Sequence, residues 1–438
     1  MSHESQTNSP SRREFLKTSA TTVAAAGLLS SQQEVVRAAH SSVRGVLKVG
    51  LVGCGGRGTG AAAQALRADK ETRLVAMADV FADRLESSLG HLKQTRVADR
   101  VSVNPDQRFV GFDAYQKLLA TDVDIVLLAT PPHFRPQHLK ACVEAGKHVF
   151  AEKPVAVDAP GVRSVLETTE AARRKNLALV SGLCWRYHFG ARAAVNQIQD
   201  GKVGRVVSLQ SMYNANRPGK PWPMIRETGW KDMEWQLRNW YWFTWLSGDH
   251  IVEQAIHSID KAAWIMHDEP PVSAVGLGGL QTRTGPDRAQ IFDHHAVLYE
   301  YANGVRHYHY CRQQPGCTNE VSTVALGSKG TCHVEKHRVY DTAGETTWRF
   351  RGKRNVMHQT EHDEMYAALR KGEIINNGLY MCRSTMLAIM GRMATYTGKK
   401  ITWDQALGSR ENFTLKQYNW EEKLTVPPVA MPGITPFV

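Results

Sequence analysis

A glutamate and a histidine in the segment SGDHIVEQAIHSIDKAAW, residues 247–264, have the types and spacing needed for proton transfer. Glu253 and His257 are spaced i, i+4, so on a helix they share one face, and Asp260 follows one turn later. Histidine accepts a hydroxyl proton readily because its pKa lies near neutrality, and a carboxylate beside it orients the ring. Two other interpretations are open. His257 could be a hydrogen-bonded core histidine, and His250, Glu253 and His257 could together bind a metal ion from one helical face.

A glycine-rich loop follows the apolar, β-rich run VLKVGLVG, residues 46–53, and precedes a helical pattern. Its G-x-G-x-x-G spacing permits a tight turn, a close approach of backbone to a pyrophosphate, and close packing of helix on strand. The start of the helix then favours the phosphate charge. The alternative is a glycine-rich turn in some other α/β protein. The predicted dinucleotide-binding residues of this loop are Gly53, Gly55, Gly56, Arg57 and Gly58.

An aspartate at the end of the second predicted strand, residues 72–80, indicates which dinucleotide is bound. The carboxylate of Asp79 would accept hydrogen bonds from a ribose diol and repel a 2′-phosphate. We therefore predict NAD as the cofactor. Arg84 lies close by in the sequence, so NADP stays open as the less favoured choice.

The segment GKHVFAEKPVAVD, residues 146–158, resembles a motif of the Gfo/Idh/MocA oxidoreductases, and the resemblance extends over about residues 46–410. It implies a Rossmann domain followed by an open-faced sheet domain that holds a sugar or cyclitol near the nicotinamide. In that family the lysine of Glu-Lys-Pro lies between nicotinamide and substrate and polarises the reacting hydroxyl. The resemblance carries this role to Lys153 and makes Glu152 and Lys153 cofactor contacts.

The segment 247–264 resembles the family's second motif, G-x-x-x-x-D-x-x-x-H-x-x-D, with Gly248, Glu253, His257 and Asp260 at the specified positions. Glu253 stands where relatives usually have aspartate, so it could orient His257 or touch the substrate directly. The resemblance implies no metal. The predicted catalytic residues are therefore Lys153, His257 and Glu253.

Further contacts are predicted around these motifs. ATPPHFRPQH, residues 129–138, should line the nicotinamide side, although Arg135 replaces a histidine common in relatives. Aromatic rings, dense between residues 222 and 245, pack well against sugar C–H faces; most of them should fill a core or a subunit contact, and one or two should face the pocket. The predicted cofactor contacts here are Thr130, Pro131 and His133, and the predicted substrate contacts are Arg186, Tyr187, Asp260, Arg312 and Trp245.

Strands and helices alternate from residue 46 to residue 187, which is typical of a doubly wound parallel sheet, and the last strand is predicted over residues 177–187 with Arg186 and Tyr187 at its end. Between residues 205 and 350 the apolar runs are shorter and alternate with polar residues, which favours a largely antiparallel sheet. Helical patterns recur at 249–266 and 378–397. We predict an α/β Rossmann domain over residues 44–187 and an α+β domain with a large open-faced sheet over residues 188–438.

The stretch SRREFLKTSATTVAAAGLLS, residues 11–30, resembles a twin-arginine (Tat) export signal, so residues 1–43 are predicted to be a signal peptide and linker. Its apolar run is too short for stable membrane insertion. The resemblance implies export to the periplasm by the Tat machinery in the folded state, often with a cofactor already bound. An ordinary basic, disordered N-terminus is the alternative.

The formal net charge of +12 comes from basic residues that are scattered along the 438-residue chain, so we predict no nucleic-acid binding. The seven cysteines are widely spaced without a C-x-x-C pair, which makes a disulfide framework unexpected. The family resemblance implies a homo-oligomer, either a dimer or a tetramer.

These features together predict an exported NAD-dependent oxidoreductase that acts on a hydroxyl of a sugar, cyclitol or glycoside and keeps its cofactor tightly bound. One alternative is a redox-neutral, NAD-using enzyme that cleaves glycosides through a keto intermediate. Another is a sugar-binding protein that keeps the fold without catalysis.

Overall fold

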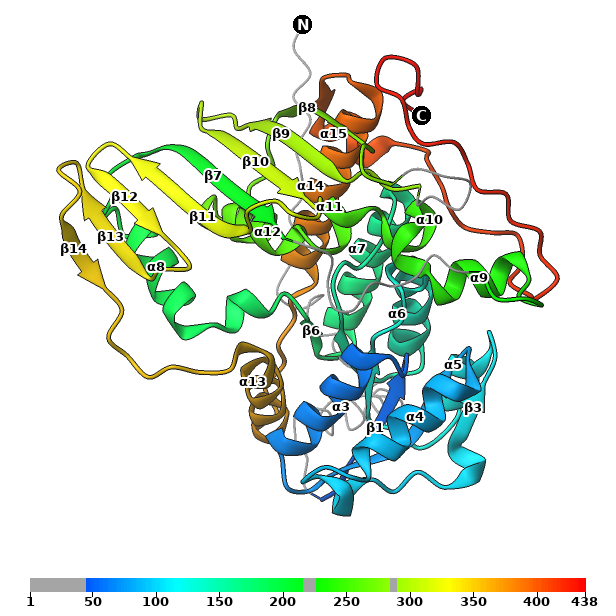
Figure 1. Ribbon diagram of the computed structural model, residues 1–438. Helices are drawn as coiled ribbons and strands as arrows, with labels where there is room; N and C mark the ends of the chain where they lie inside the picture. The colour runs from blue at the N-terminus through cyan, green and yellow to red at the C-terminus, as the bar shows by residue number, and fades with distance from the viewer. Residues whose placement is uncertain (1–44, 216–225, 284–289) are drawn as a thin grey trace, which may run out of the picture.

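The computed structural model describes residues 45–215, 226–283 and 290–438 (Figure 1). It contains a six-stranded parallel sheet and a nine-stranded, mostly antiparallel sheet, which confirms the predicted fold class. The predicted export signal and Trp222 lie outside the described residues.

The first sheet has the order β3-β2-β1-β4-β5-β6, and every neighbouring pair is parallel. Its strands are nearly continuous apolar runs because helices cover both faces. The order reverses between β1 and β4, which opens a crevice at the carboxyl ends of the strands. The strands are β1 (Leu47–Val52), β2 (Thr72–Asp79), β3 (Arg108–Val110), β4 (Ile125–Leu128), β5 (His148–Ala151) and β6 (Leu179–Ser181); the helices are α3 (Gly56–Ala68), α4 (Ala82–Leu92), α5 (Ala114–Leu119), α6 (Arg135–Glu144) and α7 (Ala159–Arg174).

The strand predicted over residues 177–187 is wrong beyond Ser181. The chain turns there and forms a short 3-10 helix, Cys184–Tyr187. Gly182 passes so close to Glu152 that an added Cβ would lie 2.7 Å from the Glu152 Oε2 atom. The Gly182 N–H still bonds the carbonyl of Ala151, the last residue of β5, at 2.9 Å, and the strand pairing ends there.

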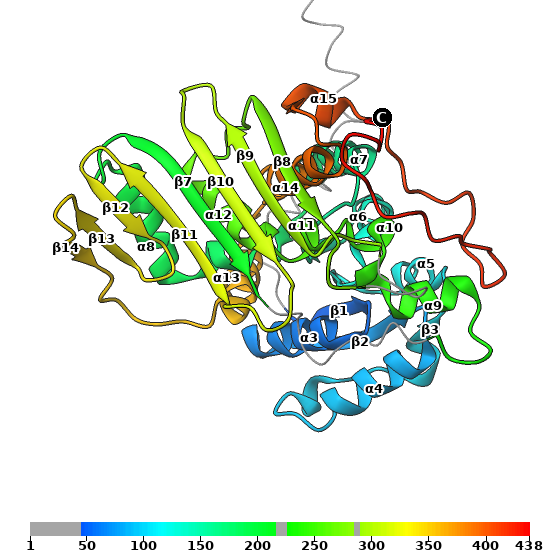
Figure 2. The same cartoon turned by 45° about the horizontal axis from the view of Figure 1, so that its top comes forward.

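The second sheet has the order β14-β13-β12-β11-β7-β10-β9-β8-β15, and only β7 and β10 pair in parallel. Helices α8 (Phe189–Gln199), α12 (Ile256–Ile265) and α14 (Gly378–Thr397) cover one face, whereas the other face is open (Figure 2). The strands are β7 (Val206–Asn214), β8 (Ser273–Gly279), β9 (His294–Glu300), β10 (Arg306–Arg312), β11 (Glu320–Gly327), β12 (Gly330–His333), β13 (Arg338–Asp341), β14 (Thr346–Arg349) and β15 (Ile401–Thr402).

Short helices lie between β7 and β8 in the chain: α9 (Asp232–Arg238), a 3-10 helix (Trp240–Trp242), α10 (Thr244–Ser247) and α11 (His250–Glu253). The helix predicted over residues 249–266 is interrupted at residues 254–255, between α11 and α12. Later in the chain, α13 (Met357–Lys371) packs against α3 of the first domain. After α15 (Trp403–Gly408), residues 409–438 contain no helix or strand, and this C-terminal arm runs back toward α9 (Figure 1).

All seven cysteines are unpaired; six are buried and Cys317 is half-buried. Within the described ranges, no helix has the length and apolar character needed to cross a membrane.

Candidate active site

A cavity of about 710 Å³ lies at the carboxyl ends of the Rossmann strands. Residues of the first domain form one wall, and residues of β7, α9, α11, α12 and the segments between them form the other. The predicted residues that line it are Gly53, Gly55, Gly56, Arg57, Asp79, Thr130, Pro131, Lys153, Glu253 and His257.

The glycine-rich loop has the shape that a diphosphate requires. Gly53 has a positive φ of 96°, and a Cβ there would lie 2.6 Å from the backbone of Ala129. A Cβ on Gly58 would lie 1.9 Å from the Gly53 carbonyl oxygen, so neither position admits a side chain. Gly55 directly precedes α3 as its N-cap, and its position supplies no side-chain cap. The N–H groups of the first helical turn are therefore available to a phosphate.

Asp79 ends β2 and is fixed by backbone groups. Its Oδ2 accepts a hydrogen bond from the Cys54 N–H (2.6 Å), and its Oδ1 accepts one from the Phe81 N–H (2.9 Å). Burial raises the pKa of Asp79, although both hydrogen bonds oppose the rise. The carboxylate lines the cavity beside Arg84, where the ribose of a bound NAD would lie. Loop and carboxylate together fit NAD.

Glu152 follows β5 and lies behind the loop, outside the set of described residues that line the cavity. Arg57 donates to Glu152 through Nε and to Glu361 of α13 through Nη2, the latter at 2.9 Å. Burial opposes ionisation of Glu152, but the charges of Arg57, Lys153 and Arg135 outweigh it and lower the Glu152 pKa. Burial raises the pKa of Glu361 to about 7. Glu152 therefore fixes the loop to β5 through Arg57.

Lys153 reaches the cavity and pairs with Glu253. Its Nζ donates to Glu253 Oε1 at 2.9 Å and also to the backbone carbonyl of Glu253. Both side chains are largely buried, with 13% and 16% of their surfaces exposed. The glutamate at this position thus contacts the lysine of the Glu-Lys-Pro motif.

His257 lines the cavity one turn beyond Glu253. Burial, assisted by the positive charge of Lys153, lowers the pKa of His257 well below its ordinary value. Its Nδ1 atom is buried and has no hydrogen-bond partner in the described part of the chain. The imidazole is therefore neutral at pH 7 and is able to accept a proton beside an ammonium group.

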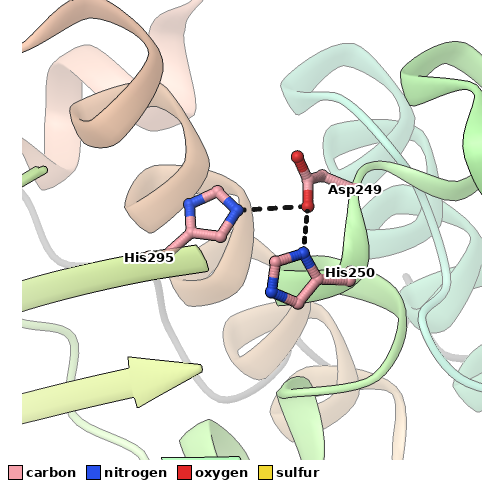
Figure 3. A group of neighbouring side chains, drawn as sticks. All are labelled: Asp249, His250 and His295. Carbon is pink, nitrogen blue, oxygen red and sulfur yellow. Dashed lines mark hydrogen bonds and ion pairs between the residues drawn. The ribbon is translucent and has the colours of Figure 1, made fainter. Parts of the chain in front are cut away.

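The metal-site alternative grouped His250 with Glu253 and His257. In the structure, the neighbours of the His250 imidazole that could share a metal ion with it are instead Asp249 and His295 (Figure 3). Asp249 Oδ1 lies 2.9 Å from His250 Nδ1 and 3.1 Å from His295 Nε2. Its Oδ2 accepts from the Phe292 N–H (2.9 Å) and the Tyr396 hydroxyl (2.5 Å). Because donors occupy both oxygens, the group is a buried hydrogen-bond network. It fixes the start of α11, which carries Glu253.

His133 and Trp245 lie together beside the cavity without lining it. His133 Nε2 shares a hydrogen bond of 2.7 Å with the Tyr418 hydroxyl, and its ring packs edge-on against Trp245. Burial lowers the pKa of His133 to about 4. The Trp245 indole donates to Gln236 Oε1 at 2.7 Å. Trp245 belongs to an aromatic cluster that supports the cavity wall, and His133 packs against it.

Arg186 and Asp260 form a buried ion pair outside the cavity. Arg186 Nη2 donates to Asp260 Oδ1 at 2.8 Å and also bonds Asp268, while the Ser384 hydroxyl donates to Asp260 at 2.8 Å. Burial raises the pKa of Asp260, and the neighbouring guanidinium opposes this. The two remaining predicted substrate contacts also lie elsewhere: the Tyr187 hydroxyl bonds Asn377, and Arg312 bonds the Thr318 carbonyl.

Three polar residues that the motifs did not indicate line the substrate end of the cavity: Tyr213, Tyr241 and Gln254. Gln313 Nε2 lies 2.5 Å from both the Tyr241 hydroxyl and Gln254 Oε1. Tyr213 lies on β7, and the sequence of this strand contains no motif that indicates a binding site. Two of these residues lie near sequence signals: Tyr241, with the neighbouring Trp240, belongs to the aromatic stretch 222–245, and Gln254 directly follows Glu253.

Comparison with known proteins agrees with this geometry. A family model described as "Oxidoreductase family, NAD-binding Rossmann fold" matches residues 47–182, and one described as "GFO/IDH/MocA C-terminal domain" matches residues 191–333. A glycosyl hydrolase family 109 protein of Shewanella amazonensis is 30% identical over 53% of this chain and 50% of its own length. Inositol 2-dehydrogenase 3 of Saccharopolyspora erythraea is 26% identical over 59% of this chain and 64% of its own length. The chain thus spans between half and two thirds of these curated relatives.

Among solved structures, levoglucosan dehydrogenase in complex with NADH and levoglucosan is similar with a TM-score of 0.63. The alignment covers 81% of this chain and 99% of that one at 16% identity, which shows a shared fold.

Proposed function

Because the chain belongs to the Gfo/Idh/MocA oxidoreductase family, we propose that it is an NAD-dependent oxidoreductase acting on a hydroxyl of a sugar, cyclitol or glycoside. The observation that carries this proposal is the convergence of Lys153, Glu253 and a neutral His257 in the cavity that Asp79 also lines. The relatives named inositol 2-dehydrogenase and levoglucosan dehydrogenase support a polyhydroxylated substrate.

The three residues divide the work of oxidising an alcohol. When bound, NAD supplies the hydride acceptor. Lys153 donates a hydrogen bond to the reacting oxygen and stabilises the negative charge that develops there. His257 takes the hydroxyl proton as the C–H bond releases its electron pair and the C=O bond forms. Glu253 balances the ammonium charge and holds Lys153 in position.

The test uses purified protein, NAD and a panel of sugars, cyclitols and glycosides, with NADH absorbance as the readout. We expect NADH to form with at least one substrate and the rate to fall at least about 10²-fold in His257→Asn, the size of a lost general base. Protein that binds no dinucleotide at any concentration would overturn the proposal.

A second candidate function is redox-neutral cleavage of a glycoside, which the relative named as a glycosyl hydrolase family 109 protein favours. Transient oxidation to a ketone would acidify the adjacent C–H, and the glycosidic bond would then leave by elimination. Product analysis separates the two functions: free aglycone without net NADH indicates cleavage, and NADH in proportion to ketone indicates a dehydrogenase.

We also propose that the protein is exported to the periplasm through the Tat machinery with its cofactor tightly bound. The support is the Ser-Arg-Arg-x-Phe-Leu-Lys order within residues 11–30. Replacement of Arg12 and Arg13 by lysine should retain the protein in the cytoplasm, as measured by cell fractionation. An unchanged distribution would refute export by this route.

A homo-oligomer formed through the open sheet is proposed as well. Val275, Leu277 and Tyr310 lie on the uncovered face, with 38%, 67% and 37% of their surfaces exposed. Val275 and Leu277 are next to Leu298 and Ala296 of β9, so the apolar surface continues across strands. Light scattering should give a dimer or tetramer mass for wild type and a monomer for Leu277→Glu. A monomeric wild type would contradict this assembly.

A further inference from the structure

The C-terminal arm, residues 409–438, is anchored at both ends although it contains no helix or strand. Near its start, the Phe413 N–H donates to Asp158 Oδ2 at 2.9 Å. Near its end, the Gly433 N–H donates to the Thr397 carbonyl at 2.9 Å. The part between these anchors extends across the molecule to the rim of the Rossmann domain (Figure 1).

The middle of the arm packs on two phenylalanines that line the cavity. The ring of Trp420 lies 4.8 Å from Phe112 and 5.6 Å from Phe81, centroid to centroid. Phe81 and Phe112 follow β2 and β3, at the end of the cavity where Asp79 faces the ribose position. Tyr418 continues the contact, with its ring 6.3 Å from Phe112.

The arm is also joined to α9, which forms part of the opposite wall. The Gln236 side chain donates to the Leu424 carbonyl at 3.0 Å, and the Leu424 N–H donates to Asp232 Oδ2 at 3.3 Å. From the same helix, the Arg238 guanidinium lies 4.0 Å over the Phe81 ring. Arm and α9 therefore enclose Phe81 from two sides.

Arg238 extends this enclosure to α4 of the Rossmann domain. It bonds Asp83 through Nη1 at 3.1 Å, and it lines the cavity beside Leu237. A dinucleotide in the cavity would thus have its adenosine end between the Rossmann rim and a wall that the arm supports.

We propose that the C-terminal arm is a latch that slows release of NAD, with Trp420 as its main positioning residue. The inference rests on the proposed function, because it concerns the same cavity. For the adenosine end to leave, Phe81 and Phe112 must move, and each is held by Trp420. Each aromatic contact is modest by itself, so the latch lowers the release rate without affecting the chemistry at Lys153 and His257.

The test measures how fast bound NADH leaves. Protein loaded with NADH is mixed with excess NAD, and the loss of energy transfer from tryptophan to NADH is followed in time. Trp420→Ala should release NADH about tenfold faster than wild type, since two aromatic pairs together account for roughly that factor. Tyr418→Phe removes only the hydroxyl bonded to His133 and should accelerate release by a smaller factor. This milder variant keeps the latch testable if Trp420→Ala does not fold.

The matched control is Trp348→Ala, which removes a half-buried tryptophan on β14, far from the cavity lining. It should release NADH at the wild-type rate. Equal release rates in wild type, Trp420→Ala and Tyr418→Phe would overturn the latch while leaving the proposed function intact. Failure of wild type to bind NADH at all would overturn the proposed function and the latch together.

Discussion

Replacement of Lys153 by methionine tests the central assignment of the site. Methionine keeps an apolar stem of similar length but removes the ammonium that donates to Glu253 Oε1 at 2.9 Å and faces the cavity. If this ammonium stabilises charge on the reacting oxygen, its loss should lower the rate of hydride transfer by about 10²- to 10³-fold, or roughly 3–4 kcal/mol, as for other lost oxyanion donors.

The same substitution should also change the pH dependence through His257. Burial and then the charge of Lys153 hold the pKa of His257 low, and the base acts only when it is neutral. Without the ammonium, protonated His257 becomes more favourable and its pKa rises. The acid limb of the rate profile should therefore move to higher pH in Lys153→Met.

The assay is single-turnover formation of NADH across the acid and neutral pH range. Lys153→Arg is the control, because it keeps the positive charge while losing the compact ammonium geometry. It should be slow like Lys153→Met yet keep the acid limb of wild type. An acid limb that stays in place in Lys153→Met, or a loss of less than about tenfold, would refute the assigned charge coupling and oxyanion role.

Three further substitutions have definite expected outcomes. Asp79→Ala should weaken NAD binding by about tenfold and reduce the preference for NAD over NADP, measured by fluorescence titration; an unchanged preference would contradict the ribose assignment. Arg186→Met should lower the free energy of unfolding by about 3–5 kcal/mol, because it leaves the fully buried Asp260 unpaired, and urea denaturation measures this. If it instead raised KM with unchanged stability, Arg186 would be a substrate contact. The pKa of Glu361 is raised from 4.5 to about 7, so the folded state binds more protons in this window and wild-type stability should fall as pH rises through it. Glu361→Gln should remove that fall. Melting temperatures of wild type and Glu361→Gln, measured across this pH window, test it; an equal decrease in both proteins would contradict the reasoning.

Local motifs allowed much of the site to be predicted. The glycine loop, Asp79 and Lys153 each follow a Rossmann strand directly, and the carboxyl ends of parallel strands meet at one edge. Glu253 and His257 reach the same cavity because one turn separates them on α11 and α12. In each case the chemistry depends on short-range geometry that residue spacing fixes.

Contacts between distant segments could not be predicted in this way. Arg186 was assigned to the substrate because it follows a strand, whereas its partners Asp260 and Asp268 come from much later in the chain. Trp420 carries no motif, and its contact with Phe112 depends on the path of the whole C-terminal arm. Tertiary packing determines such pairings, and residue spacing and hydrophobic periodicity carry no information about it.

The difference in burial between Cys317 and the other six cysteines allows opening of the structure to be followed by thiol labelling. An alkylating reagent should label Cys317 quickly in the native protein, whereas the six buried thiols react only when the structure around them opens. In whole-protein mass spectra recorded over time, molecules that carry one label have stayed native, and molecules that carry more labels have opened. Cys54 within the glycine loop and Cys332 in the second sheet would report whether the two domains open together or one before the other.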